Sequence, residues 1–273
     1  MTALADAHVL VTGGSSGIGL ATARLVLDHG GRVSIVARDP DRLARAAGAL
    51  ESAAGDPSRV AAEPADVTDP NAIDRAVVSL TAALGPIDVL VANAGAAIPG
   101  HFEDLDLSVF EAQMRLNYFG TLHPIRAVVP SMISRGKGHV VVVSSGAGIV
   151  GVYGYAAYSP TKFAVRGLAE ALRAELKPHG IVVSCAFPPD TETPGLVAED
   201  VTKPEATKRI SAGIKVRSAA TVARAIVSGI ERDRFVITAD PTSAMLARTS
   251  GLIAPFVRWS MDRHVRKAPK SSK

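Results

Sequence analysis

The sequence predicts an α/β fold built on a doubly wound, mostly parallel sheet of seven strands with helices on both faces. Short apolar runs alternate with helical patterns almost to the end of the chain. Most of these runs are apolar at every position, as in strands that a parallel sheet buries on both faces. The expected strands are His8–Val11, Arg32–Ala37, Arg59–Ala62, Asp88–Ala92, His139–Ser144, Ile181–Phe187 and Phe235–Ala239.

Helix boundaries are marked between the expected strands. Asp39 stands before Pro40 and Asp69 before Pro70, and each pair indicates an N-cap followed by proline at the first helical position. Gly85 is placed to end the second of these helices. With 273 residues and 47% apolar composition, we expect one compact catalytic domain over residues 1–250 and a separate tail over residues 251–273.

Composition and charge exclude several classes of protein. Cys185 is the single cysteine, so no intrachain disulfide is possible, and its apolar surroundings predict an inert core thiol in a reducing compartment. Neither a signal peptide nor an apolar run long enough to span a membrane is recognisable, and we expect a cytoplasmic protein. The net charge is +4, but residues 258–273 hold six basic residues and one acidic residue. The rest of the chain is therefore close to neutral, which argues against nucleic-acid binding, and the sequence predicts no metal site.

A glycine-rich turn follows the first expected strand and opens an amphipathic helix. It reads TGGSSGIG at Thr12–Gly19. Glycines allow a tight turn and a close approach of a pyrophosphate to the backbone, and the helix N-terminus offers unpaired N–H groups to that anion. A glycine-rich loop alone is weak support, but the place of this one between strand and helix predicts a dinucleotide site. The residues expected to contact the cofactor are Gly13, Ser15, Ser16, Gly17, Ile18 and Gly19.

The end of the second strand indicates which dinucleotide binds. A site that prefers NAD places an acidic residue there to hold the ribose 2′-hydroxyl, whereas this chain has an alanine followed by Arg38. A guanidinium can accept a 2′-phosphate as a bidentate partner, and Arg42 could add a second positive charge. The sequence therefore favours NADP(H). The alternatives are Arg38 as a solvated surface charge and Asp39 as the ribose ligand, although the following proline makes Asp39 the better N-cap.

A serine, a tyrosine and a lysine suggest proton transfer. Ser145 follows the fifth expected strand, Tyr158 comes thirteen residues later, and Lys162 lies four residues beyond Tyr158. On a helix that begins near Tyr158, positions i and i+4 share a face, so the ammonium can lower the pKa of the phenol. That makes Tyr158 a usable general acid for a carbonyl oxygen that receives hydride. The spacing alone also fits a surface pair, but Tyr153 and Tyr155 have no lysine four residues on.

In these motifs the chain resembles the short-chain dehydrogenase/reductase family over nearly its whole length. The matching elements are TGGSSGIG at Thr12–Gly19, ADVT at Ala65–Thr68, NAG at Asn93–Gly95, Asn117 within RLNYFG, Ser145, and YSPTK at Tyr158–Lys162. Their order and spacing together make the resemblance specific. It implies a Rossmann-type domain and a homo-oligomer.

The resemblance implies four catalytic residues. Tyr158 would be the proton donor, and Lys162 would lower its pKa and hydrogen-bond the nicotinamide ribose. Ser145 would orient the substrate carbonyl, and Asn117 would hold a water in the proton relay.

The resemblance also implies further contacts to the cofactor. Asp66 and Val67 resemble a pair that contacts adenine, and Asn93 resembles an asparagine that lines the cofactor site. The alternatives are an N-cap for Asp66 and a turn residue for Asn93. After the sixth strand, where the family usually has proline-glycine, two prolines stiffen the loop because proline fixes φ. The residues expected to line the cofactor there are Pro188, Thr191 and Thr193.

Longer phrases resemble one branch of that family, the 3-ketodihydrosphingosine reductases. They are VARDPDRL, GHFEDL, FAVRGLAEALRAELKP, PPDTETPG and the TKP at Thr202–Pro204, and they lie between about residues 8 and 215. This resemblance implies NADPH-dependent reduction of a long-chain 3-keto sphingoid base. Another hydrophobic carbonyl or alcohol, such as a steroid, a 3-oxoacyl chain or a polyketide, stays open because the expected substrate lid, at about residues 193–216, is recognised by shape. An NADP-binding redox sensor without turnover is a third possibility, against which the intact catalytic set argues.

The predicted tail mixes large apolar side chains with basic ones around Trp259, the only tryptophan. A basic amphipathic segment of this kind suits peripheral contact with the inner surface of a membrane. The alternative is a terminal helix that packs on the body of the protein or on a partner subunit. A lipid substrate favours the membrane.

Overall fold

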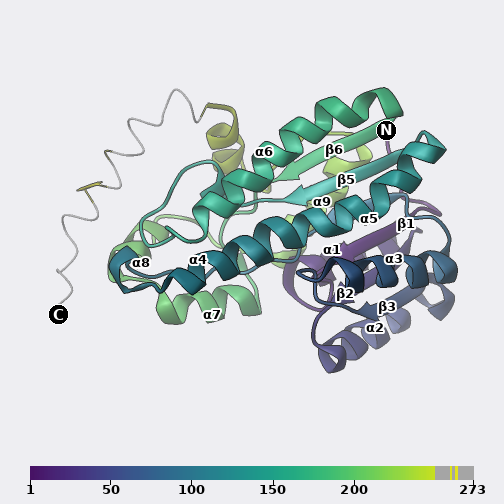
Figure 1. Ribbon diagram of the computed structural model, residues 1–273, viewed down its shortest axis with the longest axis horizontal. Coiled ribbons are helices and arrows are strands. Elements are labelled where there is room, and N and C mark those ends of the chain that lie inside the picture. The colour runs from purple at the N-terminus through teal and green to yellow at the C-terminus, as the bar shows by residue number, and fades with distance from the viewer. Residues whose placement is uncertain (250–258, 260–261, 264–273) are drawn as a thin grey trace.

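The computed structural model describes residues 1–249, 259 and 262–263 of the chain, and its centre is a parallel sheet (Figure 1). The strand order is β3-β2-β1-β4-β5-β6-β9, and every neighbouring pair is parallel. The strands are β1 (His8–Thr12), β2 (Arg32–Ala37), β3 (Val60–Pro64), β4 (Val89–Ala92), β5 (Gly138–Val143), β6 (Ile181–Ala186) and β9 (Val236–Ile237). The predicted doubly wound fold is confirmed, with boundaries shifted by a few residues at most.

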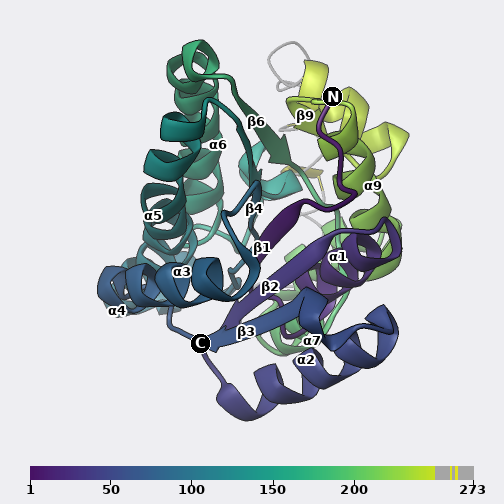
Figure 2. The same ribbon diagram turned by 90° about the vertical axis from the view of Figure 1, so that its right-hand side faces the viewer.

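Helices cover both faces of the sheet (Figure 2). One face carries α1 (Gly17–Asp28), α2 (Pro40–Ala54) and α9 (Ala219–Glu231), and the other carries α3 (Pro70–Leu84), α5 (Gly120–Arg135) and α6 (Ser159–Leu176). Successive strand residues point to opposite faces, so Val9 and Val11 join the first core layer while Leu10 joins the second. This double burial is the physical reason why the strands are apolar at every position.

The predicted N-caps are present. Asp39 accepts a hydrogen bond from the N–H of Arg42 at 3.0 Å, and Asp69 accepts one from the N–H of Asn71 at 2.9 Å. Gly85 follows α3 with a positive φ of 83°. The shorter helices are η1 (Pro57–Arg59), η2 (Phe102–Asp104), α4 (Leu107–Met114), η3 (Arg115–Phe119), η4 (Gly146–Gly148) and η5 (Lys177–His179). Among the described residues, no helix is long and apolar enough to cross a membrane.

The expected lid contains two helices, α7 (Pro194–Thr202) and α8 (Glu205–Ser211). A second sheet, which the sequence did not reveal, joins its two ends through β7 (Thr191–Glu192) and β8 (Arg217–Ser218). Two-residue strands carry no recognisable periodicity, and this explains why the pattern missed them. The arrows of β5 and β6 point to the end of the molecule where α4, α7 and α8 gather (Figure 1).

A fully buried histidine lies near the amino end of β5. His139 is 0% exposed, and its ring nitrogens contact the hydroxyl groups of Ser184 at 2.7 Å and Thr2 at 3.0 Å. Burial lowers the pKa of His139 from 6.5 to about 4, although the nearby Asp233 carboxylate favours the charged ring. His139 therefore stays neutral in the folded protein at pH values where the unfolded chain already binds a proton.

This burial predicts a loss of stability in mild acid. As pH falls from 6.5 towards 4, the unfolded chain gains the proton first, so the free energy of unfolding decreases by up to about 3 kcal/mol. His139→Gln removes this contribution, and the difference between wild type and variant in urea unfolding should shrink or reverse as pH falls. The control, His179→Gln, changes an exposed histidine and should follow the wild type. A difference between wild type and His139→Gln that does not depend on pH would contradict this explanation.

Candidate functional site

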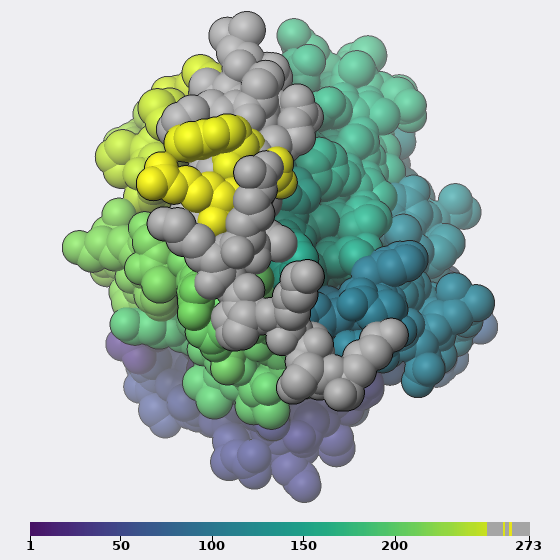
Figure 3. Space-filling view, turned by 90° about the vertical axis from the view of Figure 1, so that its left-hand side faces the viewer, coloured from purple at the N-terminus to yellow at the C-terminus, as the bar shows by residue number. Residues whose placement is uncertain are grey.

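The predicted site residues gather at the carboxyl edge of the sheet. Because all seven strands run in one direction, each strand delivers its following loop to this edge. The loops bring Gly13–Gly19 after β1, Arg38 after β2, Asp66 and Val67 after β3, Asn93 after β4, Ser145 after β5 and Pro188–Thr193 after β6. The lid (green) and α4 (blue) lie on the same face of the molecule (Figure 3).

The glycine turn is tightly folded and is tied to β4. Gly13 and Gly17 have φ values of +65° and +54°, which L side chains rarely adopt, and a Cβ on Gly19 would lie 2.4 Å from the carbonyl oxygen of Gly13. The side chain of Asn93 donates to the carbonyl oxygen of Thr12 at 3.0 Å. Asn93 lies outside any turn itself but fixes the glycine turn through this bond, and its contact with a cofactor stays a prediction.

The start of α1 fits a dinucleotide pyrophosphate. Ser16 is the N-cap residue but makes no side-chain capping bond, and the first turn carries no acidic residue. The N–H groups of this turn are therefore not capped by a side chain and can receive an anion. Thr193 lies against the turn, because a Cβ on Gly17 would come within 2.9 Å of its methyl carbon. Ser15 is half-buried, and Ile18 packs against the core.

Arg38 follows β2, and Arg42 lies in the first turn of α2. The Arg38 side chain is 83% exposed, and its guanidinium lies 4.0 Å from the Asp66 carboxylate. Arg42 lies 3.9 Å from Asp39, whose carboxylate is engaged as an N-cap. Asp66 accepts from the N–H of Thr68 at 2.9 Å in a local turn. Its alternative role as an N-cap is wrong, because Asp69 caps α3. The neighbouring Val67 is buried. This corner therefore presents two exposed guanidinium groups, each about 4 Å from a carboxylate, and the contacts to adenine stay a prediction.

Tyr158 and Lys162 meet at the start of α6, as the spacing predicted. Lys162 is 3% exposed, and its ammonium donates to the carbonyl oxygen of Val143 at 3.1 Å. It lies 5.6 Å from the centre of the Tyr158 ring. Burial lowers the pKa of Lys162 to about 8. The cation and the phenol therefore share one water-poor space.

Tyr158 is held as a protonated phenol. Burial raises its pKa, the nearby carboxylates of Glu199 and Asp190 raise it further, and a hydrogen bond with Ser145 acts in the opposite direction. Ser145 also accepts from the N–H of Ala147 at 3.1 Å, which fixes its hydroxyl oxygen. A tyrosine bonded to a serine in this way can deliver a proton to an oxygen placed between them. The expected lowering of this pKa by Lys162 is not found, because burial and the two carboxylates raise the pKa overall.

Asn117 occupies η3, a π-helical turn between α4 and α5, and is fully buried. Its amide nitrogen donates to the carbonyl oxygen of Ala96 at 3.0 Å, and its amide oxygen accepts from the N–H of Ala96 at 3.1 Å. A further contact reaches Gln113 at 3.3 Å. The side chain is thus committed to the loop after β4, and its role in holding a water stays a prediction.

The loop after β6 joins the glycine turn to the serine loop. The carbonyl oxygen of Pro188 accepts from the N–H of Gly146 at 3.1 Å, beside Ser145. Thr193 caps α7 by accepting from the N–H of Leu196 at 3.1 Å. The buried Thr191 donates its hydroxyl to the preceding loop at 2.7 Å, so that hydroxyl serves the loop itself.

The sequence did not reveal a buried ionic network beside Tyr158. The ammonium of Lys203 lies 3.1 Å from Glu199, 3.9 Å from Asp190 and 2.7 Å from Asp200. Tyr155, considered only as a rival to the catalytic tyrosine, donates its hydroxyl to Glu199. The sequence offered one signal for this network, because Glu199 and Asp200 precede Lys203 by four and three residues. Such spacings usually indicate a pair on the surface of a helix.

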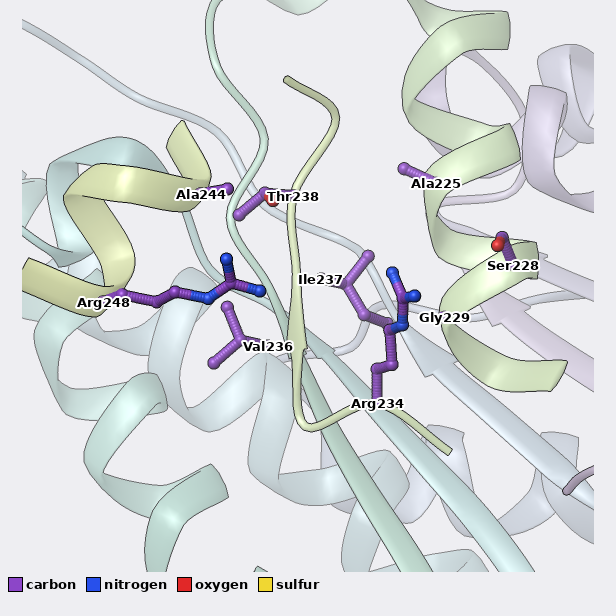
Figure 4. A pocket seen from close by; sticks show the side chains of 9 residues that line it. All are labelled: Ala225, Ser228, Gly229, Arg234, Val236, Ile237, Thr238, Ala244 and Arg248. Carbon is purple, nitrogen blue, oxygen red and sulfur yellow. The ribbon is translucent and has the colours of Figure 1, made fainter. Parts of the chain in front are cut away.

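A separate pocket lies between α9, β9 and residues 241–249 (Figure 4), with a volume of about 210 Å³. Arg234 and Arg248 contribute its charged side chains. None of the predicted site residues lines it, so it is distinct from the site at the carboxyl edge of the sheet.

Comparisons with known proteins agree with this geometry. Residues 7–217 match the sequence model of a family described as short chain dehydrogenase. The 3-dehydrosphinganine reductase of Danio rerio is 42% identical over 252 residues, covering 91% of this chain and 76% of that protein. The 3-ketodihydrosphingosine reductase of Bos taurus is 42% identical over 255 residues, covering 93% and 77%. A short chain dehydrogenase/reductase from Burkholderia phymatum in complex with NAD superimposes with a TM-score of 0.82 at 23% identity, over 94% of this chain and 97% of that one, which shows a shared fold.

Proposed function

Because this chain belongs to the short-chain dehydrogenase/reductase family, we propose that it reduces the 3-keto group of a long-chain sphingoid base with NADPH, using Tyr158 as the proton donor. The protein is an oxidoreductase that uses a nicotinamide cofactor. The observation that carries the proposal is the meeting of Tyr158, Ser145 and Lys162 beside the glycine turn. The names of the relatives supply the substrate class.

The chain's own residues provide the proton and the orientation. A bound nicotinamide cofactor supplies the hydride. Tyr158, protonated because burial raises its pKa, donates its proton to the ketone oxygen. Ser145 is hydrogen-bonded to Tyr158 and orients the same oxygen. The Lys162 ammonium, 5.6 Å from the tyrosine ring, favours the phenolate that proton donation leaves behind.

Two exposed valines on α7 support a long alkyl substrate. Val197 and Val201 are 70% and 80% exposed, and they lie four residues apart on α7, so they share one face of the helix. An apolar surface of this kind on the lid suits a ligand with a hydrocarbon chain.

For the proposed function, the first prediction concerns a variant that lacks the proton donor. Tyr158→Phe keeps the ring but loses the hydroxyl, so turnover of the ketone should fall by at least about a hundredfold while the cofactor still binds. Lys162→Ala should weaken both cofactor binding and rate. Steady-state kinetics with 3-ketosphinganine, together with fluorescence titration by NADPH, measure the two effects. Near-full activity of Tyr158→Phe would refute the proposed mechanism.

The second prediction concerns the choice of NADP(H), which the positive charge after β2 supports. Arg38→Ala should weaken NADPH binding by about 1.5–3 kcal/mol, the value of a charge-assisted contact, and change NADH binding little. Arg24→Ala, which removes an exposed arginine from α1, serves as the control. If Arg38→Ala weakens the binding of NADPH and NADH equally, or if the wild type prefers NADH, the 2′-phosphate does not bind at this corner.

The third prediction concerns the tail. We propose a cytoplasmic homo-oligomer that contacts the inner membrane surface through residues 251–273. Of that segment the structure describes Trp259, Asp262 and Arg263, and the guanidinium of Arg263 lies 5.7 Å from the Trp259 ring. The other tail residues lie outside the described residues.

Deletion of residues 251–273 should reduce co-sedimentation with anionic vesicles, because each basic residue near such a surface contributes about 1 kcal/mol. Activity on vesicle-borne ketosphinganine should fall, and activity on a short soluble ketone should be spared. Equal sedimentation of both forms at low and high salt would assign the tail to packing on the protein.

A further inference from the structure

The ionic network beside Tyr158 contains two partly buried carboxylates that share one ammonium. We infer that Glu199, together with Asp190, selects substrates that carry an ammonium group on the carbon next to the ketone. This inference rests on the proposed function and names the feature of the sphingoid head group that the site recognises.

The geometry leaves the network short of positive charge. Lys203 is 2% exposed in its side chain and stands between Glu199, at 3.1 Å, and Asp190, at 3.9 Å. These carboxylates are only 16% and 27% exposed, whereas the third acidic neighbour of the lysine, Asp200, is 56% exposed and faces water. Two enclosed negative charges therefore meet one enclosed positive charge.

Such an imbalance is unfavourable unless a ligand corrects it. The hydroxyl groups of Tyr155 and Ser211 bond to the two carboxylates and replace part of their lost hydration, but they supply no positive charge. Burial raises the pKa of Asp190 and of Glu199 even though Lys203 acts in the opposite direction. Burial alone would lower the pKa of Lys203, but its bonds to Asp200 and Glu199 raise it overall, so this cation is already committed. A cationic group of the substrate would supply the missing charge.

The network lies close to the Tyr158 side chain. Tyr155 donates its hydroxyl to Glu199, and its ring centre is 5.8 Å from that of Tyr158. Asp190 belongs to the loop whose Pro188 carbonyl is bonded beside Ser145. Both carboxylates act on the pKa of Tyr158, which places them within electrostatic reach of its hydroxyl.

The chemistry of a 2-amino ketone matches this arrangement. Its ammonium is bonded to the carbon next to the carbonyl, so a substrate whose ketone oxygen meets Tyr158 carries its positive charge into the same space. There the ammonium can form charge-assisted hydrogen bonds with Glu199 and Asp190. It also offsets their repulsion of the phenolate that forms when Tyr158 gives up its proton. The site would thus favour the amino ketone both in binding and in the transition state.

The test compares two ketones that differ only in the amino group. We would measure kcat/KM with NADPH for 3-ketosphinganine and for the same ketone without the 2-amino group, both in nonionic micelles. The wild type should prefer the amino ketone by at least about tenfold, and Glu199→Gln should reduce this preference by about 10- to 100-fold. Glu199→Asp keeps the charge and should restore part of the preference. Glu205→Gln, the control, neutralises an exposed acid of the lid that pairs with Arg209 instead of Lys203, and should keep the preference.

The outcomes separate the inference from the proposed function. If Glu199→Gln lowers kcat/KM equally for both ketones, the carboxylate only holds the lid in place. The inference is then wrong, whereas the proposed function stands. A wild type that reduces both ketones equally well leads to the same conclusion. A wild type that reduces neither ketone refutes the proposed function and the inference with it. If Glu199→Gln fails to fold by circular dichroism, Asp190→Asn provides the same comparison, and a preference unchanged in that variant would overturn the inference.

Discussion

The common direction of the seven strands is the constraint on which the site depends. A parallel strand can be followed by its neighbour only after a crossover, so each strand sends its carboxyl end, and the loop after it, to one edge. The order β3-β2-β1-β4-β5-β6-β9 places β1 between β2 and β4. The glycine turn after β1 therefore has the basic corner after β2 on one side and the Asn93 loop after β4 on the other, with the serine loop after β5 one strand further. Reversal of one strand would remove its loop from this edge.

Within this frame, a few close contacts hold the start of α6 against the end of β5. The Ser144 hydroxyl donates to the carbonyl oxygen of Lys162 at 2.9 Å, and the Lys162 ammonium donates to the carbonyl oxygen of Val143 at 3.1 Å. A Cβ on Gly148 would lie only 2.4 Å from the Ser144 hydroxyl oxygen, so glycine is required for this approach. Tyr158, directly before α6, is thereby set against Ser145. The position of the proton donor thus follows from the packing of one helix end on one strand end.

The sequence predicted the parts of the molecule that local physics determines. Strands buried on both faces are apolar at every position, and Asp39 and Asp69 cap their helices through bonds within three residues. The central pair of the candidate site followed, because Tyr158 directly precedes the helix whose first turn carries Lys162. The π-helical turn at Asn117 and the Lys203 network could not be predicted in this way. They depend on contacts such as Tyr155 with Glu199, 44 residues apart, and no periodicity records which acid meets which lysine in the folded chain.

Hydride delivery to the 3-keto carbon at this edge of the sheet is the central claim. The most direct measurement is to incubate the protein with 3-ketosphinganine and NADPH that carries deuterium at both C4 positions of the nicotinamide, and to analyse the product by mass spectrometry. We expect sphinganine with a single deuterium, located at the former ketone carbon. Absence of reduced product, or a reduced product without deuterium, would contradict the claim.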